Sequence, residues 1–289
     1  MNDAPSPHDG LPPLLEAPAT GGVFINRRRW WIHLILVAAY ILVVAVAGRE
    51  QSANQTHMPA LSHTAGGLLL VCAIQLLIFG VVLGLALIAS RASRDDLLLR
   101  WRRGFLPVPL GIAYSVAIRF AVGIVMMIGV VALMATHVVT AQSMNHFLAV
   151  NRPNLEAVVD ISAMRQNPLY FWLTVTVVSF VVAGLREELW RSAFLAGLRN
   201  LWPQYFGSGA GQVRAVAVAA VLFGFAHLAM GWIAVLFAGL LGFGLGLIMV
   251  FHRSIWPAVI AHGMFDATSL ALLPWVIEKL PDIQRTLGH

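Results

Sequence analysis

Long apolar segments alternate with shorter polar segments along the chain after its first 26 residues. A helix needs about 20 residues to cross the roughly 30 Å hydrocarbon core of a bilayer, and each apolar segment reaches or nearly reaches that length. The alternating pattern of membrane β-barrel strands is absent. The sequence therefore predicts an all-α fold, a polytopic membrane helix bundle with about seven to eight transmembrane helices. The expected spans are residues 30–48, 66–90, 110–136, 169–198, 213–230, 232–251 and 255–276.

The chain divides into four regions by composition. Residues 1–26 are rich in Pro, Gly and Ala without periodicity, which is typical of a disordered tail. Residues 27–168 hold the first three spans with their polar loops, and residues 169–276 hold the other spans. Residues 277–289 are expected to form a C-terminal tail. The first apolar segment is long for a signal peptide and lacks a small-residue cleavage pattern, so we expect it to stay in the protein.

Composition excludes a soluble fold and narrows the partners. Charged residues make up 11% of the chain and hydrophobic residues 59%, whereas soluble proteins carry roughly 25% charged residues. The net charge of +6 comes almost entirely from arginines that flank the spans on one side. The positive-inside rule places this side and the N-terminus in the cytoplasm, at a bacterial plasma membrane in our interpretation. The charge therefore indicates topology and not nucleic-acid binding. A single cysteine, Cys72, excludes an internal disulfide and a thiolate zinc site.

One short charged stretch interrupts the fourth span. Its members are Arg186, Glu187, Glu188 and Arg191. A charged side chain in the middle of a membrane costs roughly 2.5–3.5 kcal/mol, so these groups must pair or face a wet interior. Glu187 and Arg191 are i,i+4 neighbours, and we expect a salt bridge between them. Glu188 points about 100° away and has no evident partner in its own helix. Arg119, in the third span, is likewise expected to face another helix.

Three further ionisable side chains lie in apolar spans, namely His227, His262 and Asp266. The chemistry that this set supports is hydrolysis. Glu187 or Glu188 would take a proton from water, while the two histidines would donate to the developing oxyanion. Alternatively, His227, His262 and Glu187 would hold a zinc ion with an open position for water, and Asp266 would orient His262. The sequence contains neither His-Glu-x-x-His nor Gly-x-Ser-x-Gly, which removes the common soluble metalloprotease and serine hydrolase interpretations.

These positions fall into motifs. Phe223 and His227 fit the pattern Phe-x-x-x-His. His262 and Asp266 fit His-x-x-x-Asn/Asp, preceded by Ser-Ile-Trp-Pro-Ala-Val-Ile-Ala. With the glutamate pair upstream, and in this order, the motifs resemble the CAAX protease and bacteriocin-processing family of intramembrane proteases, also called the Abi family. The resemblance covers about residues 169–275 and implies a supporting role for Phe223.

The first motif departs from the family pattern by one residue. The family has Glu-Glu-x-x-x-Arg, and this chain has Glu187-Glu188-Leu-Trp-Arg191. If Arg191 keeps the family position, Arg186 stands in the first glutamate position and Glu187 in the second. If the glutamate pair keeps its position, Ser192 replaces the arginine. The resemblance assigns water activation to the first glutamate. We favour Glu187 as the base, with Glu188 as a supporting residue or alternative ligand and Arg191 in support.

The resemblance implies an intramembrane endopeptidase that acts on membrane-associated or lipidated proteins, such as prenylated tails or bacteriocin and pheromone precursors. Membrane lipids and a peptide or lipidated protein are then the expected partners, and the oligomeric state is open. The family is named for metalloproteases, yet the same residues allow a metal-free, glutamate-activated water, so zinc stays open. A proton- or solute-coupled transporter would use these residues as a relay, but no duplicated half is visible. A catalytically silent scaffold is the third interpretation.

Depth in the membrane sets a condition for a shared site. At 1.5 Å per residue from the cytoplasmic helix ends, Glu187 lies roughly 18 Å deep, His227 roughly 20 Å and His262 roughly 10 Å. Helix tilt or a broken helix must absorb this difference. In the sixth span, Gly242 and Gly246 form a small-xxx-small face, where we expect a neighbouring backbone to come close.

Overall fold

The computed structural model describes residues 26–54, 62–101, 104–137, 139–151, 153 and 159–287. Every regular element in these residues is a helix, and seven helical stretches are long and apolar enough to cross a membrane. This confirms the predicted polytopic bundle. The spans are Arg27–Val46 of α1 (Arg27–Asn54), α2 (Ala65–Ser90), α3 (Pro107–Ala135), Pro168–Leu201, α9 (Gly209–Ala226), α10 (Trp232–His252) and Trp256–Lys279 of α11 (Trp256–Leu287). The expected tail at residues 1–26 lies outside the described residues except for its last residue.

The fourth span is continuous but not uniform. It consists of α6 (Pro168–Leu173), a π-helix η2 (Thr174–Leu185) and α7 (Arg186–Leu201). Short helices lie between the spans, namely α4 (Ala141–Val150), α5 (Ile161–Gln166), α8 (Pro203–Phe206) and η3 (Leu228–Met230). The polar segment 137–168 therefore contains helices that the sequence pattern did not predict.

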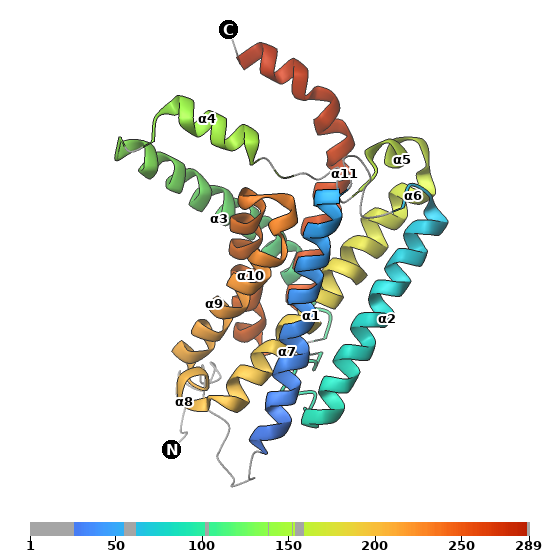
Figure 1. The fold of residues 1–289 in the computed structure, drawn as a ribbon, viewed down its shortest axis with the longest axis vertical. Helices are drawn as coiled ribbons and strands as arrows, with labels where there is room; N and C mark the ends of the chain where they lie inside the picture. Colours follow the sequence, from blue (N-terminus) through green and yellow to red (C-terminus); the bar gives the residue numbers. More distant parts are fainter. Residues whose placement is uncertain are drawn as a thin grey trace, which may run out of the picture.

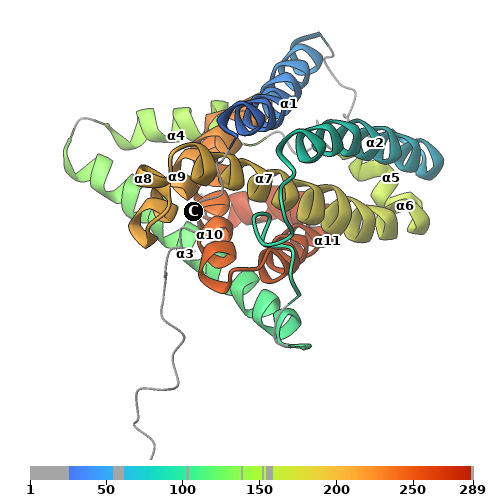
Figure 2. The ribbon, with the colours of Figure 1, turned by 90° about the horizontal axis from the view of Figure 1, so that it is seen from below.

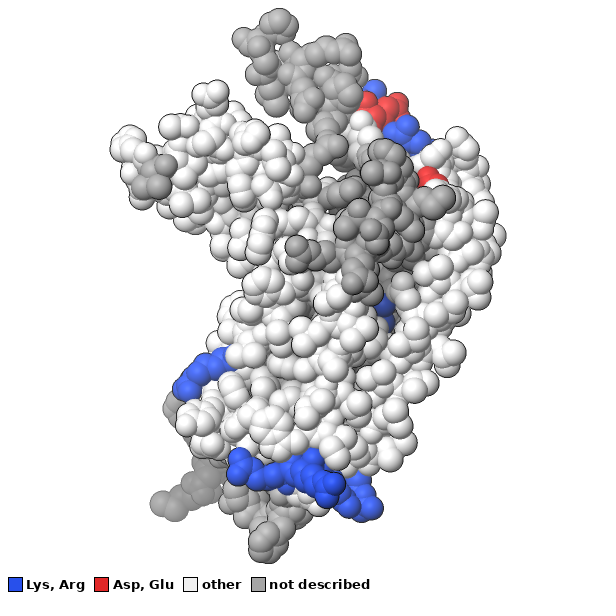
Figure 3. All heavy atoms as spheres, in the orientation of Figure 1, with Lys and Arg blue, Asp and Glu red and all other residues white. Residues whose placement is uncertain are grey.

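The two ends of the bundle differ in charge. α1 begins at one end and α11 finishes at the other (Figure 1), as an odd number of crossings requires. Lys and Arg side chains gather at the end where α1 begins, and few charges are visible between the ends (Figure 3). The assignment of this end to the cytoplasm stays a prediction. α11 continues to Leu287 and so includes most of the segment 277–289 that was expected to form a separate tail.

The helices form three layers (Figure 2). α1 and α2 form one side, η2, α7 and α9 the middle, and α10, α11 and α3 the other side. α7 packs against α1, η2 packs against α11, and α9 packs against α10. Large apolar side chains are buried between the layers, including Trp190, Phe194 and Leu245, while many others face outward. The outward apolar surface suits a lipid environment, in which helices need no polar face.

The π-helix brings the fourth span close to α11. Within this segment the side chain of Ser179 donates through Oγ to Thr174 O, five residues back. At its end, a Cβ on Gly184 would lie 3.0 Å from Val259 O, and a Cβ on Gly263 would meet the ring of Phe180. The two glycines therefore allow the helices to cross within contact of their backbones. A π-helical stretch changes the direction of the side chains that follow it, and such stretches are frequent at functional sites.

α9 ends earlier than predicted. The helix finishes at Ala226, and His227 is its C-cap residue, whereas the apolar pattern extended the span to residue 230. The chain then turns through η3 and Gly231, whose φ of 99° favours glycine. α9 and α10 come close together at Gly224, where a Cβ would lie 2.7 Å from Val235 O.

The predicted glycine face of α10 has a different partner from the one expected. A Cβ on Gly242 or Gly246 would meet side chains of α9, Phe223 and Val216 respectively, and not a backbone. These glycines therefore make room for bulky side chains, and the close backbone contact lies one turn away at Gly239 and its neighbours.

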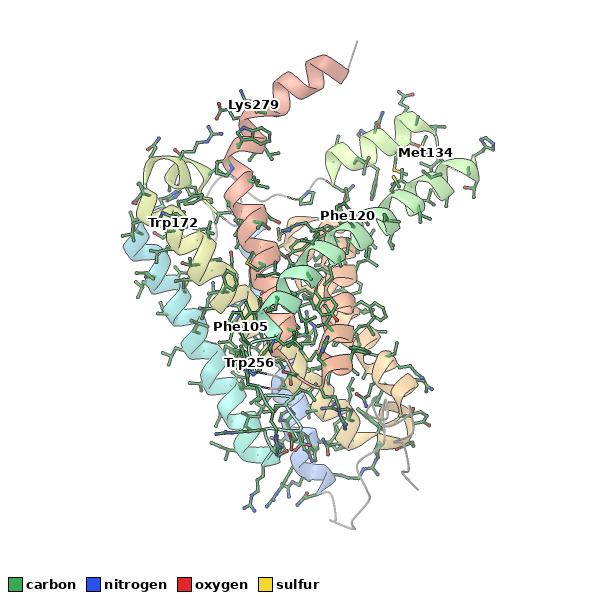
Figure 4. The ribbon with its side chains drawn as sticks, turned by 180° about the vertical axis from the view of Figure 1, so that it is seen from behind. Phe105, Phe120, Met134, Trp172, Trp256 and Lys279 are labelled. Atoms are coloured by element: carbon green, nitrogen blue, oxygen red, sulfur yellow. The ribbon has the colours of Figure 1, made fainter. Side chains whose placement is uncertain are left out.

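α3 is tied to α11 by one cation. Arg119 Nη2 donates to Phe265 O, to Thr268 Oγ1 and, at 3.2 Å, to Ser269 Oγ, and its guanidinium lies 4.4 Å from the centre of the Phe265 ring. This confirms that Arg119 faces a partner helix. Beyond this point α3 leaves the bundle, as the outward positions of Phe120 and Met134 show in Figure 4.

Candidate active site

α7 and α11 bring an acid, an arginine and an imidazole together inside the bundle. Glu188 and Arg191 are fully buried and form an ion pair. His262 on α11 places Nδ1 2.9 Å from Glu188 Oε1. The expected pair between Glu187 and Arg191 is therefore wrong, because i,i+3 spacing also brings side chains together. The guanidinium of Arg191, which pairs with Glu188, also lies over the ring of Phe223, whose centre is 4.6 Å away.

Glu187 has a different environment from its neighbour. Its side chain is 18% exposed, and Oε1 accepts a hydrogen bond of 2.9 Å from Arg186 Nη2. Oε2 lies 3.9 Å from His262 Nε2. Of the two adjacent glutamates, Glu188 is enclosed and paired, whereas Glu187 is partly exposed, lines a cavity, and has its Oε2 too far from His262 Nε2 for a direct hydrogen bond. Only Glu187 therefore meets the condition that a base must reach the water it activates.

Three carboxylates surround His262. Nδ1 faces Glu188, while Nε2 lies 3.9 Å from Glu187 Oε2 and 3.7 Å from Asp266 Oδ2. An ionised carboxylate only accepts hydrogen bonds, so Nδ1 of His262 carries a hydrogen. The i,i+4 pair with Asp266 forms at ion-pair distance and is too long for a direct hydrogen bond. Nε2 also becomes a donor when the ring is doubly protonated, and the surrounding carboxylates balance that charge.

The tautomer of His227 is set by its own helix. Nδ1 lies 2.8 Å from the carbonyl oxygen of Phe223, one turn earlier. A carbonyl only accepts, so Nδ1–H donates, and Nε2 of the neutral ring keeps its lone pair. The end of α9 at this residue gives the ring its place at the edge of a cavity. His227 is thereby prepared to accept a hydrogen bond through Nε2.

A cavity of about 100 Å³ lies between α1, α7 and the end of α9, helices that contact one another pairwise and lie side by side in Figure 2. It has room for water, since a cavity needs about 10–15 Å³ of such volume to hold one molecule. Glu187 and His227 both line it, whereas His262 and Asp266 approach Glu187 from the α11 side. The lining residues are Tyr40, Ile41, Val44, Arg186, Glu187, Trp190, Phe223, Ala226 and His227.

Phe223 connects the two halves of the cluster. Its ring centre lies 4.8 Å from that of His227 and 6.2 Å from that of His262, and Arg191 lies over its face. The space for this ring exists because α10 carries Gly242, where a Cβ would lie 2.8 Å from Phe223 Cδ1.

We predict that Gly242→Ala lowers both stability and activity. The added methyl group presses on the ring of Phe223 and through it on both imidazoles, and overpacking of this kind costs about 1–3 kcal/mol. Unfolding by denaturing detergent and turnover in proteoliposomes measure the two effects. Gly123→Ala on α3 is the matched control, since no atom lies within 4 Å of its Cβ position. Equal effects of the two substitutions would contradict the packing role of Gly242.

The zinc set of His227, His262 and Glu187 does not fit a metal site in this arrangement. In the parts of the chain that the structure describes, no group of three or more His, Cys, Asp or Glu side chains is placed to hold a metal ion. The ring of Phe223 packs against both imidazoles.

Sequence reasoning found the ionisable residues of α7, α9 and α11 but missed the wall of the cavity. Tyr40 of α1 lines it, and Gln75 of α2 accepts a hydrogen bond of 2.8 Å from Arg186 Nη1. The available signal was the amide of Gln75 in an otherwise apolar span. Tyr40 gave no signal, because a tyrosine in a membrane helix is ordinary.

Fold and cluster together define the class: a helical membrane protein with carboxylates and imidazoles gathered beside an internal cavity. Residues 168–268 match the family described as type II CAAX prenyl endopeptidase, Rce1-like. This match agrees with the resemblance seen over residues 169–275. It extends from α6 into α11 and contains every predicted site residue, whereas α1, α2 and α3 lie outside it. Searches of curated proteins and of solved structures gave no match.

Proposed function

We propose that the protein is an intramembrane endopeptidase that hydrolyses peptide bonds of membrane-associated or lipidated substrates with a water activated by Glu187. The observation that carries this proposal is the cavity that Glu187 and His227 share, with His262 next to Glu187 on the other side. The match of residues 168–268 to the Rce1-like family supports CAAX-type protease activity in general.

In the proposed reaction, one water in the cavity donates its hydrogens to Glu187 and to Nε2 of His227. Both are acceptors in the arrangement described above, so an oxygen lone pair of the water is directed at the substrate carbonyl. Glu187 takes the proton as the new C–O bond forms. As the C–N bond breaks, the same carboxyl group returns the proton to the departing amine. No covalent enzyme intermediate is needed.

The developing negative charge on the carbonyl oxygen needs a donor, and His262 is our candidate. With both ring nitrogens protonated, Nε2 donates while Nδ1–H stays on Glu188. Asp266, 3.7 Å from Nε2, orients the ring and balances its charge. Glu188 and Arg191 then have no direct role in the chemistry, and they hold His262 in place.

The test uses purified protein in proteoliposomes and two peptides of one sequence, one with a prenyl group and one without. We expect cleavage of the lipidated peptide, detected by mass spectrometry, with slower or no cleavage of the free peptide. Solute flux without cleavage would favour the transporter interpretation. The absence of both flux and cleavage would favour the scaffold.

Metal dependence is tested separately. We expect turnover to persist in protein that has been treated with a chelator and contains less than one zinc per ten chains by elemental analysis, because the proposed reaction uses Glu187 and two imidazoles alone. Loss of turnover on chelation, restored by stoichiometric zinc, would overturn the metal-free mechanism and leave the protease assignment standing.

A further inference from the structure

A short chain of hydrogen bonds links Glu187 to α2, outside the segment that matches the protease family. Gln75 Oε1 accepts from Arg186 Nη1 at 2.8 Å, and Arg186 Nη2 donates to Glu187 Oε1 at 2.9 Å. The side chain of Arg186 is 13% exposed, lines the cavity and points along it towards the carboxylate.

Helix geometry alone does not produce this contact. Arg186 and Glu187 are adjacent residues, and neighbours in an α-helix point about 100° apart. An anchor on another helix is needed to turn the arginine towards the following carboxylate. Gln75 supplies an anchor of this kind, because the guanidinium can only donate hydrogen bonds and Gln75 Oε1 accepts one from Nη1. The guanidinium is planar, so the direction of Nη2 is fixed once Nη1 is bound.

The contact with Arg186 also gives the two carboxylate oxygens of Glu187 different partners. Oε1 of Glu187 is held by Arg186, while Oε2 lies 3.9 Å from His262 Nε2, and the Glu187 side chain lines the cavity. A carboxylate held at one oxygen cannot rotate freely, so its second oxygen keeps a fixed direction towards a bound water. Effects of this kind are large, because a misplacement of about 1 Å at a reacting group can cost up to ~10²-fold in rate.

We propose that Gln75 and Arg186 are positioning residues that hold the carboxylate of Glu187 in its reactive orientation. The inference rests on the proposed function, in which Glu187 is the base. It adds α2, from the N-terminal part of the chain, to the machinery of the segment that matches the Rce1-like family. The alternative is that Arg186 only compensates the charge of Glu187, with Gln75 as a passive neighbour.

Kinetics separate these two roles. Gln75→Leu removes the acceptor and keeps the volume, and we expect kcat to fall about tenfold with KM unchanged, since orientation and not substrate binding is lost. Arg186→Lys keeps the positive charge but loses the planar guanidinium that binds Gln75 and Glu187 at the same time. We therefore expect Arg186→Lys and Arg186→Gln to lower kcat to a similar extent. Adding Gln75→Leu to Arg186→Gln should have no further effect, because the two residues act in series. Gln166→Leu on α5, whose amide donates to Ser162 of its own helix, is the control.

A readout that does not need turnover completes the test. In protein labelled with ¹³C-glutamate, the infrared band that disappears in Glu187→Gln belongs to Glu187, and we expect Gln75→Leu to shift it while Gln166→Leu does not. A shifted band in a protein that cleaves no peptide would uphold the positioning role of Gln75 and Arg186 and defeat the proposed function. An unshifted band and full kcat in Gln75→Leu, or full kcat in Arg186→Lys, would overturn the positioning role.

Discussion

Glu187→Gln is expected to abolish peptide hydrolysis and to leave the fold intact. Glutamine has nearly the volume of glutamate and still accepts the hydrogen bond from Arg186, but it cannot take a proton from water. A positioned general base contributes about 10²–10⁴-fold to a rate, so kcat should fall by at least two orders of magnitude. Single-turnover cleavage in proteoliposomes measures the loss, and the detergent-unfolding midpoint shows whether the bundle is preserved.

Two further variants make this result specific. Glu278→Gln changes an exposed carboxylate on α11, whose side chain is 59% accessible, and it should retain full activity. His227→Ala removes the second acceptor of the water and should lower kcat less than Glu187→Gln does, since one acceptor remains. If Glu187→Gln cleaves at the rate of the unmodified protein, the water is activated elsewhere, and Glu188 becomes the candidate despite its burial.

The spans and the ionisable residues that gather in the candidate site could be predicted because both depend on the cost of exposure to lipid. Every helix that crosses the membrane must be apolar over about 20 residues, and this requirement is visible in sequence. The same cost makes Glu187, His227 and Asp266 conspicuous, since ionisable groups persist in such helices only where partners or water receive them. The prediction that Arg119 faces a neighbouring helix followed from the same reasoning.

The directions of these side chains could not be predicted. Arg191 pairs with Glu188 and not with Glu187 in a position where its guanidinium lies over the ring of Phe223. Phe223 belongs to α9, which is far from Arg191 in sequence, so this contact is not visible in the sequence. The π-helix has the same apolar composition as an α-helix, so composition does not distinguish the two, and the close approach of α11 at Gly263 is visible only in the structure. The early end of α9 was hidden because the residues that follow His227 are apolar as well.

Breaking the buried pair of Glu188 and Arg191 should be the largest stability effect in the molecule. Arg191→Met leaves the carboxylate of Glu188 enclosed without its arginine, and removal of one partner of a buried ion pair typically costs about 3–5 kcal/mol. The exposed pair of Arg100 and Asp95, with side chains 61% and 50% accessible, supplies the control. Arg100→Met should change the unfolding free energy by less than about 1 kcal/mol.

Replacing both partners should restore much of that stability without restoring function. In the described part of the chain, Glu188 Oε2 and Arg191 Nε have no hydrogen-bond partner, so the pair carries an uncompensated desolvation cost, and an apolar pair of similar volume often recovers stability. The double variant Glu188→Leu, Arg191→Met should therefore unfold at higher denaturant than Arg191→Met alone. It should still cleave poorly, because His262 loses the acceptor at Nδ1 that fixes its ring. A double variant as unstable as the single one would show that the pair contributes net stability, and one with full activity would show that His262 needs no such support.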